Sequence, residues 1–255
     1  MHIVFRLISR LEGISVTEKS TYEPFKIDII GTGSSGNCVV IDNSIVIDCG
    51  LPIKKIGQTV IDADALFITH RHSDHLNLSI LHHLYRKAPW KLTQSLYTNA
   101  DVEKKIIADR SPRFEPTLNQ QHIYDQHSNI QITAGGRQYA VQMFPLHHDV
   151  ENEGFVFTRD DGKKLIYATD TNSIADAPSE KFDAIMLEGN FDEDKIIDYL
   201  KSDDFNERFR AMRNMRHLSV QQFENFVSTH AKSQAEIYQL HESGTFGIES
   251  TLAEN

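Results

Sequence analysis

The amino-acid sequence predicts a mixed α/β fold (α+β) in which β-sheets are covered by helices on the outside. Segments with strand character alternate with helical patterns along the chain, and no internal repeat or obvious linker interrupts them. Turn dipeptides between runs of β-branched and aromatic residues indicate antiparallel strand pairs. The chain has 255 residues, of which 40% are hydrophobic, so it can bury one large core. We therefore expect a single domain over residues 1–255, with residues 1–25 as an N-terminal extension.

The first hairpin is predicted at Asp42-Asn43, a turn-forming pair between the apolar runs Cys38–Ile41 and Ser44–Asp48. The glycine-rich segment Gly31–Asn37 comes just before this hairpin and directly after another strand-like run. A nucleotide-binding glycine loop requires a helix after it, whereas here a second strand follows. We interpret the segment as a tight loop whose small residues let the backbone pass close to a functional site.

Later turns and helices continue the alternating pattern. The turns Gly135-Gly136 and Asp161-Gly162 each lie between strand-like runs and predict two further antiparallel pairs. Helical periodicity predicts helices at about Leu76–Tyr85, Asp101–Ile107, Glu193–Leu200 and Val220–His230. The last of these begins with Ser219-x-x-Gln222, which is the spacing of a capping box.

Charge and cysteine content restrict the partners and the location of the protein. The net charge of -10 argues against a broad basic face for a long polyanion, so any such face must be local. The one candidate is the arginine-rich segment Phe205–Arg216, which reads equally well as a solvated helix face and as a phosphate clamp. The start of the chain, Met1–Leu7, is too short and too polar for a signal peptide or a membrane span. Since Cys38 and Cys49 are expected to be reduced thiols, we expect a cytoplasmic protein with no membrane partner.

The strongest chemical signal is a cluster of four potential metal ligands directly after the apolar run Leu66–Thr69. The cluster contains His70, His72, Asp74 and His75. Residues two apart on an extended segment point to the same side, so His70 and His72 can bind one ion while the other two face a second ion. Further ligands from other strand ends are needed to complete two coordination shells.

Four motifs in this order resemble the metallo-β-lactamase superfamily: Ile47-Asp48-Cys49-Gly50, Thr69-His70-Arg71-His72-Ser73-Asp74-His75, Leu146-His147-His148-Asp149 and Tyr167-Ala168-Thr169-Asp170-Thr171. The resemblance covers about residues 26–243 and implies a four-layer αββα sandwich. Within the superfamily, the chain resembles the phosphodiesterase branch, which includes ribonuclease Z, the WalJ-like exonucleases and the phage anti-Pycsar enzymes that degrade cyclic mononucleotides. The motif Glu188-Gly189-Asn190 is similar to WalJ-like proteins as well.

The resemblance implies two divalent metal ions held by seven side chains. One ion is assigned to His70, His72 and His148, the other to Asp74, His75 and His241, and Asp170 bridges the two. A carboxylate at the end of an apolar run suits the bridging position, because its two oxygens can hold a metal pair. His147 and His148 compete for one ligand position, and the resemblance favours His148 because an acidic residue follows it. Histidine-rich shells suit zinc, while the Asp pair also admits manganese.

The resemblance also suggests roles beyond metal binding. Asp74 would orient the nucleophile as well as bind metal, and His217 would donate a proton to the leaving oxygen near neutral pH. The alternatives for His217 are a structural role or the last ligand position in place of His241. Asp48 is interpreted as a carboxylate that supports the ligand loop. The candidates for contact with the substrate are His147, Arg208, Arg210 and Arg213.

These assignments predict metal-assisted phosphodiester hydrolysis in a metal-dependent hydrolase. An acidic chain without a long basic insertion favours a compact substrate. The resemblance to the anti-Pycsar enzymes then implies a small cyclic nucleotide, with a role in phage evasion of bacterial cyclic-nucleotide defence in the host cytoplasm. The alternative is an exonuclease or RNA-processing nuclease of the WalJ or ribonuclease Z type, acting on a single-stranded nucleic-acid end. Lactonases, thioester hydrolases and β-lactamases of the same superfamily are weaker alternatives. Relatives in this branch also suggest a homodimer, and residues 1–23 are one candidate for its contacts.

Overall fold

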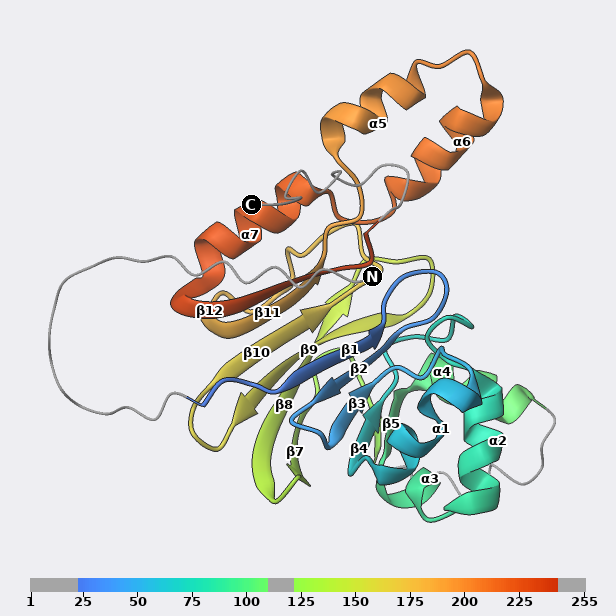
Figure 1. Cartoon of the computed structure of the whole chain (residues 1–255), viewed down its shortest axis with the longest axis vertical. Coiled ribbons are helices and arrows are strands. Elements are labelled where there is room, and N and C mark those ends of the chain that lie inside the picture. Colours follow the sequence, from blue (N-terminus) through green and yellow to red (C-terminus); the bar gives the residue numbers. More distant parts are fainter. Residues whose placement is uncertain (1–22, 110–121, 243–255) are drawn as a thin grey trace, which may run out of the picture.

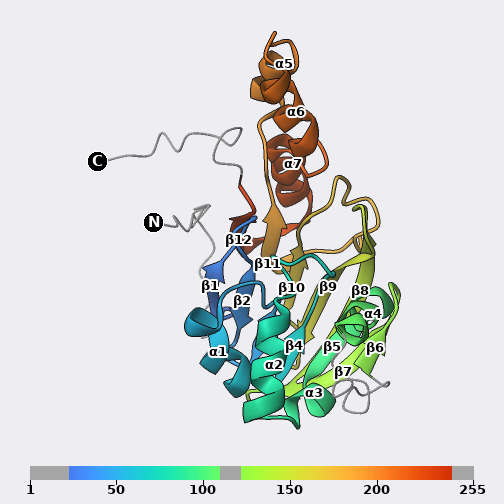
Figure 2. The same ribbon diagram turned by 90° about the vertical axis from the view of Figure 1, so that its right-hand side faces the viewer.

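The computed structural model describes residues 23–109 and 122–242, which form two six-stranded β-sheets packed face to face (Figures 1 and 2). Side chains from both sheets fill the space between them, among them Phe67 of the first sheet and Phe155 and Phe157 of the second. The rings of Phe67 and Phe155 lie 5.3 Å apart, and those of Phe67 and Phe157 lie 5.5 Å apart. The inward side chains of two facing sheets thus form one shared core.

The first sheet begins with antiparallel strands and continues with parallel ones. In order across the sheet, its strands are β1 (Ile27–Gly31), β2 (Cys38–Ile41), β3 (Ile45–Ile47), β4 (Ala65–Phe67), β5 (Leu96–Asn99) and β6 (Ile123–Tyr124). Strands β1 to β3 pair antiparallel, whereas β3 to β6 pair parallel. Parallel strands require crossover connections, and helices lie between β3, β4 and β5 in the chain. The carboxyl ends of β3 and β4 therefore lie at the same edge of the sheet.

The second sheet also changes from antiparallel to parallel pairing along the chain. In order across the sheet, its strands are β12 (Ala231–Leu240), β11 (Phe182–Glu188), β10 (Lys164–Ala168), β9 (Asn152–Arg159), β8 (Arg137–Leu146) and β7 (Asn129–Ala134). Strands β7 to β10 pair antiparallel, and β10 to β12 pair parallel. Consequently β8, β10, β11 and β12 all end at one edge.

The three predicted antiparallel turns are confirmed. Asp42 and Asn43 connect β2 to β3 with φ angles of 48° and 58°. Asp and Asn adopt such left-handed values more readily than other side chains, and Ser44 completes the connection between the paired residues Ile41 and Ile45. The other two turns, Gly135-Gly136 and Asp161-Gly162, connect β7 to β8 and β9 to β10.

Helices cover the outer faces of both sheets and confirm the predicted four-layer αββα sandwich (Figures 1 and 2). The helices on the first sheet are α1 (Ile53–Asp62), α2 (Leu78–Lys87), α3 (Lys91–Gln94) and α4 (Ala100–Ala108). Helix α7 (Val220–His230) packs on the second sheet through Phe223 and Phe226. Helices α5 (Glu193–Leu200) and α6 (Phe205–Asn214) project from the sandwich as an arm (Figure 1).

The predicted helices agree with α2, α4, α5 and α7, and the capping box of Ser219 and Gln222 is present at the start of α7. Helices α1 and α3 were not predicted, and Phe205–Arg216 contains α6. Among the described residues, no helix combines the length and the apolar character that crossing a membrane requires. The predicted N-terminal extension, except for its last three residues, lies outside the described ranges.

Candidate metal centre

The predicted metal ligands lie where strands of both sheets end. Strand β4 leads into the segment that contains His70 and His72, and β8 leads into His148. Asp170 follows β10, and His241 directly follows β12. Because these strand ends meet at one edge of the sandwich, residues up to 171 positions apart in the sequence lie together.

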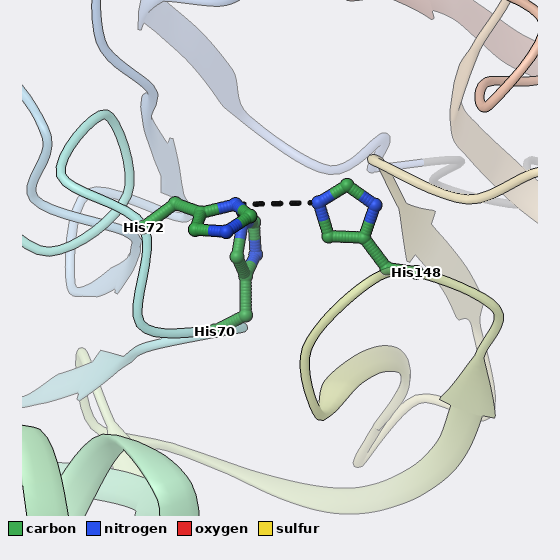
Figure 3. A group of neighbouring side chains, drawn as sticks. All are labelled: His70, His72 and His148. Carbon is green, nitrogen blue, oxygen red and sulfur yellow. Dashed lines mark hydrogen bonds between the residues drawn. The ribbon is translucent and has the colours of Figure 1, made fainter. Parts of the chain in front are cut away.

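The side chains of His70, His72 and His148 bring their ring nitrogens together (Figure 3). Nε2 of His70 and Nε2 of His148 lie 3.1 Å and 3.3 Å from Nδ1 of His72. Three nitrogens about 2.1 Å from a tetrahedral zinc ion would lie roughly 3.4 Å from one another, so these separations suit one ion. Burial lowers the pKa of His70 and of His148, which favours the neutral rings that bind metal.

A second group of possible ligands lies beside the first and shares Asp170. Nε2 of His75 lies 2.7 Å from Oδ2 of Asp170, and Nε2 of His241 lies 3.6 Å from Oδ1 of the same carboxylate. Among the described residues, the buried Nε2 of His241 has no hydrogen-bond partner. A buried polar atom without a partner is costly, and a bound cation would satisfy it. The residues present therefore fit a divalent metal ion, and Asp170 lies between the two groups.

Asp74 lies at the margin of the second group. Its Oδ2 is 3.9 Å from Nε2 of His75, and its side chain is partly exposed. The backbone of Asp74 is held in place, because its carbonyl oxygen accepts a hydrogen bond of 2.7 Å from the backbone N–H of Asn37. Gly50 also packs against this carbonyl so closely that a Cβ atom there would lie 1.7 Å from the oxygen. Only a glycine allows the ligand loop to approach the backbone in this way.

Asp48 forms hydrogen bonds with two residues of the predicted ligand loop. Its fully buried carboxylate accepts hydrogen bonds of 2.8 Å from the backbone N–H of Thr69 and of 2.7 Å from Nδ1 of His75. A proton on Nδ1 leaves the lone pair of Nε2 free to bind a metal ion. Burial lowers the pKa of His75, but Asp48 and Asp170 on either side raise it, and the pKa ends well above its ordinary value.

Three of these residues adopt a backbone conformation that is rare for side chains other than glycine. Asp48, Asp170 and His241 have φ angles of 62°, 56° and 53°. The other two non-glycine residues with positive φ in the described ranges form the Asp42-Asn43 turn. Such strain costs on the order of 1–3 kcal/mol per residue and is concentrated at functional sites. It turns the chain abruptly where each strand ends, which brings the side chain back over the edge of the sheet.

Glu188 is the residue that the sequence reasoning did not assign to the site. It ends β11, is fully buried, and lies with Oε2 3.0 Å from Nδ1 of His217 and 3.5 Å from Nδ1 of His241. Its Oε1 accepts a hydrogen bond of 2.6 Å from the backbone N–H of Thr171. Burial raises the pKa of Glu188, but its hydrogen bonds with both histidines lower it below its ordinary value. A carboxylate directly after the apolar run 184–187 was the signal, since a buried charge requires partners.

His217 and His241 lie beside each other, and both approach the carboxylate of Glu188. The centres of the two rings are 4.8 Å apart, and Nδ1 of His217 lies 3.6 Å from Oδ1 of Asp170. Because Nδ1 faces Glu188, Nε2 is the ring nitrogen left to face a substrate. The geometry is compatible with the predicted proton donor, and the ligand role also stays open because His217 and His241 lie within one group of possible ligands.

The predicted substrate-contacting residues lie outside both groups. His147 is about half exposed at the rim, and its Nε2 lies 2.6 Å from Oδ2 of Asp176. Arg208, Arg210 and Arg213 belong to α6, where Arg208 donates to the carbonyl of Ser202. Across the two described ranges, no hydrogen bond or ion pair joins these arginines to the ligand histidines. Their phosphate-binding role stays a prediction.

The glycine-rich loop lies close to the site, as the sequence predicted. A Cβ atom on Gly33 would lie 3.8 Å from the ring of His241, and Oγ1 of Thr32 accepts a hydrogen bond from the backbone N–H of His241. At the other end of the loop, Nδ2 of the buried Asn37 lies 2.8 Å from Nε2 of His75. The loop therefore contacts the residues proposed for the second ion from two sides.

Comparison with known proteins agrees with this geometry. The sequence is 28% identical over 213 residues to exodeoxyribonuclease WalJ of Streptococcus pneumoniae, an alignment that covers 76% of this chain and 72% of WalJ. Human tRNase Z, short form, has a similar structure with a TM-score of 0.61 and 16% sequence identity, over 86% of this chain and 93% of the other.

Two further solved structures share the fold. The metallo-β-lactamase fold protein YhfI of Bacillus subtilis has a TM-score of 0.60 and 18% identity, over 89% of each chain. A diphosphatase of the PhnP family has a TM-score of 0.53 and 15% identity, over 88% of this chain and 97% of the other. The model of the β-lactamase superfamily domain matches residues 43–241. Because that match spans most of the chain, the protein belongs to the β-lactamase superfamily and is a hydrolase of the metallo-β-lactamase fold.

Proposed function

We propose that the protein is a phosphodiesterase that hydrolyses nucleotide phosphodiesters with two divalent metal ions. The observation that carries this proposal is the convergence of histidine and aspartate side chains from four strand ends around Asp170. One ion would be held by His70, His72 and His148, and the other by Asp74, His75 and His241, with Asp170 between them.

The bound ions would supply a water of lowered pKa and neutralise charge on the phosphoryl oxygens. The imidazole-rich ligand set suits zinc, and the two aspartates also admit manganese. The close approach of three ring nitrogens supports a cation at the first position, and the buried Nε2 of His241 supports one at the second.

The protein supplies the proton and the orientation. His217 donates a proton from Nε2 to the departing oxygen, while Glu188 accepts the hydrogen bond from Nδ1 and fixes the ring. Asp74 orients the attacking water, and the partly exposed position of its side chain leaves it accessible to solvent. His147 lies at the rim beside His148 and contacts the substrate from there.

Two nucleotide substrates remain candidates, each with its own support. The relationship to WalJ, an exodeoxyribonuclease, supports a nucleic-acid end. The net charge of -10 supports a compact cyclic mononucleotide, because a long polyanion is repelled by an acidic surface. The site chemistry is the same for both, since each presents a phosphodiester to the metal pair.

A parallel turnover assay tests the proposal and separates the two substrates. The full chain is incubated with zinc or manganese and with cyclic mononucleotides, 5′- or 3′-labelled single-stranded DNA, and single-stranded RNA. Hydrolysis of one class at a rate that His72→Ala abolishes supports the proposal and identifies the substrate. If the protein binds two metal ions but hydrolyses none of these diesters, the proposed function is refuted.

A further inference from the structure

The ligands assigned to the first ion come from two segments that belong to different sheets. His70 and His72 follow β4 of the first sheet, whereas His148 follows β8 of the second (Figure 3). A ring nitrogen that is ready to bind a metal ion is an acceptor, and two facing acceptors form no hydrogen bond with each other. The alignment of the two segments before an ion binds therefore depends on contacts outside the three rings.

The side chain of Asn99 makes such a contact. Asn99 ends β5, and its Nδ2 donates hydrogen bonds to the carbonyl oxygen of Thr69, at 3.3 Å, and to the carbonyl oxygen of Glu151, at 3.4 Å. Thr69 directly precedes His70, and Glu151 lies three residues after His148. One amide group thus holds the backbone of both segments.

Two further contacts fix the direction of the Asn99 amide. Its Oδ1 accepts a hydrogen bond of 2.8 Å from the backbone N–H of Val102 and so caps helix α4. The opposite end of the amide, Nδ2, lies 2.5 Å from Oε2 of Glu153. Asn99 and Glu153 are both fully buried. Burial raises the pKa of Glu153 to about 8, so at pH 7 its carboxyl group is mostly neutral and accepts this hydrogen bond without adding a charge.

The carbonyl groups before the first ligand have side-chain partners because the pairing of β4 with β5 ends there. The backbone N–H of Ile68 still donates to the carbonyl oxygen of Tyr97. The carbonyl oxygen of Ile68 accepts a hydrogen bond of 2.7 Å from the hydroxyl of Tyr124, and that of Thr69 accepts from Asn99. A buried carbonyl without a partner is costly, so the backbone at Thr69 would shift if the Asn99 donor were removed.

We propose that Asn99 is a positioning residue for the first metal ion, because its amide joins the segment of His70 to the segment of His148. The inference rests on the assignment of His70, His72 and His148 to one ion, which is part of the proposed function. A site whose ligands are already aligned binds more tightly, since less freedom is lost on binding. Groups that orient metal ligands typically contribute about 10- to 100-fold to affinity. Asn99 acts through the backbone, so its contribution should be about 10-fold.

The second ion depends on other contacts. Nδ1 of His75 lies 2.7 Å from Oδ2 of Asp48, and Nδ2 of Asn190 donates a hydrogen bond of 2.6 Å to the carbonyl oxygen of His241. Neither contact includes Asn99. Removal of the Asn99 donor should therefore weaken one ion and leave the other unchanged.

Two variants remove the amide donor with different side effects. Asn99→Asp keeps the size of the side chain and its capping oxygen but introduces an acid. Asn99→Ser keeps a capping hydroxyl but leaves a space, and it is too short to reach both carbonyls. An effect that the two variants share is due to the lost donor.

Zinc affinity of the full chain, measured by chelator competition, tests the proposal. In an otherwise wild-type chain, each Asn99 variant should bind one of two zinc ions about 10-fold more weakly. In the His241→Ala background, which lacks a ligand of the second ion, the remaining ion reports on the first group and should show the same loss. Leu84→Ala is the control for stability: Leu84 is 1% exposed in the C-terminal half of α2, whereas the ligand loop precedes the N-terminal end of that helix. Its zinc affinities should equal those of the wild type.

Three results would overturn the role of Asn99. They are an unchanged zinc affinity in either Asn99 variant, an equal loss for both ions, and a similar loss in Leu84→Ala. If His241→Ala itself binds no zinc, the assignment of the first ion fails, and the role of Asn99 fails with it. Zinc binding by His241→Ala that does not respond to the Asn99 variants would refute the role of Asn99 alone.

Discussion

Replacement of Asp48 by Asn tests how the ligand loop controls metal binding. Oδ1 of Asp48 accepts the backbone N–H of Thr69, and Oδ2 accepts Nδ1–H of His75. In the variant, the amide oxygen must stay at the Thr69 position, because an NH2 group there would face another donor. The NH2 group then faces Nδ1 of His75 and forces the proton onto Nε2. The lone pair that the second ion needs is therefore lost.

The expected effect follows from that single hydrogen bond. Loss of the partner of a metal-binding histidine typically lowers metal affinity by about 10- to 100-fold, or roughly 1.4–2.8 kcal/mol. Because the tautomer is reversed as well as released, we expect the upper end of this range. Elemental analysis and chelator competition should show two zinc ions per wild-type chain. Asp48→Asn should keep one ion of unchanged affinity, because His70, His72 and His148 are intact.

Asp183→Asn provides the control for the loss of a buried carboxylate. Asp183 is 7% exposed and lies at the beginning of β11, whereas Glu188 lies at the end of that strand beside the site. Its partners are the backbone N–H of Lys164 and the amino group of Lys232. The control should bind both ions as the wild type does. Two tightly bound ions in Asp48→Asn would refute the reasoning that the Nδ1 proton of His75 governs the second ion.

Three further predictions concern catalysis, stability and the ligand loop. His217→Ala should retain both metal ions and lose at least about 100-fold in turnover, whereas His72→Ala should lose metal as well. Elemental analysis checks the metal content, and an ion missing from His217→Ala would make His217 a ligand. Burial raises the pKa of Glu153 to about 8, so the folded state holds a proton that the unfolded state releases. The contribution of Glu153 to the free energy of unfolding is therefore fully present below about pH 4.5. Between about pH 4.5 and pH 8 the free energy of unfolding declines by roughly 2–5 kcal/mol, because only the folded state still holds the proton. In urea unfolding at a series of pH values, Glu153→Gln should flatten this decline. If the free energy of unfolding falls equally with pH in the variant and the wild type, the prediction is wrong. Gly50→Ala would place a methyl group 1.7 Å from the carbonyl oxygen of Asp74, so the ligand loop must shift. Turnover should then fall about 100-fold, and unchanged kinetics would contradict this expectation.

The sequence predicted much of the fold because its signals are local. The Asp42-Asn43 turn and the Ser219 capping box depend on a few adjacent residues, and both are present in the structure. Helix α1 was missed although Ile56 and Val60 lie on its buried face, because it sits between two short buried strands whose apolar residues obscure the helical period. The projecting arm also escaped prediction, since periodicity identifies a helix but not whether it packs on a sheet.

By itself, the sequence determined that His70, His72, Asp74 and His75 lie together directly after an apolar strand, and from this it predicted a ligand loop supported by Asp48. These residues are close along the chain, and the end of an apolar strand fixes where they point. Only the tertiary structure decided that Glu188 holds His217 and His241, residues 29 and 53 positions further along the chain. That contact depends on the parallel pairing of β11 with β12 and of β10 with β11, which follows from packing between whole sheets. Strand order in a sheet is a property of the assembled core, and no short sequence pattern encodes it.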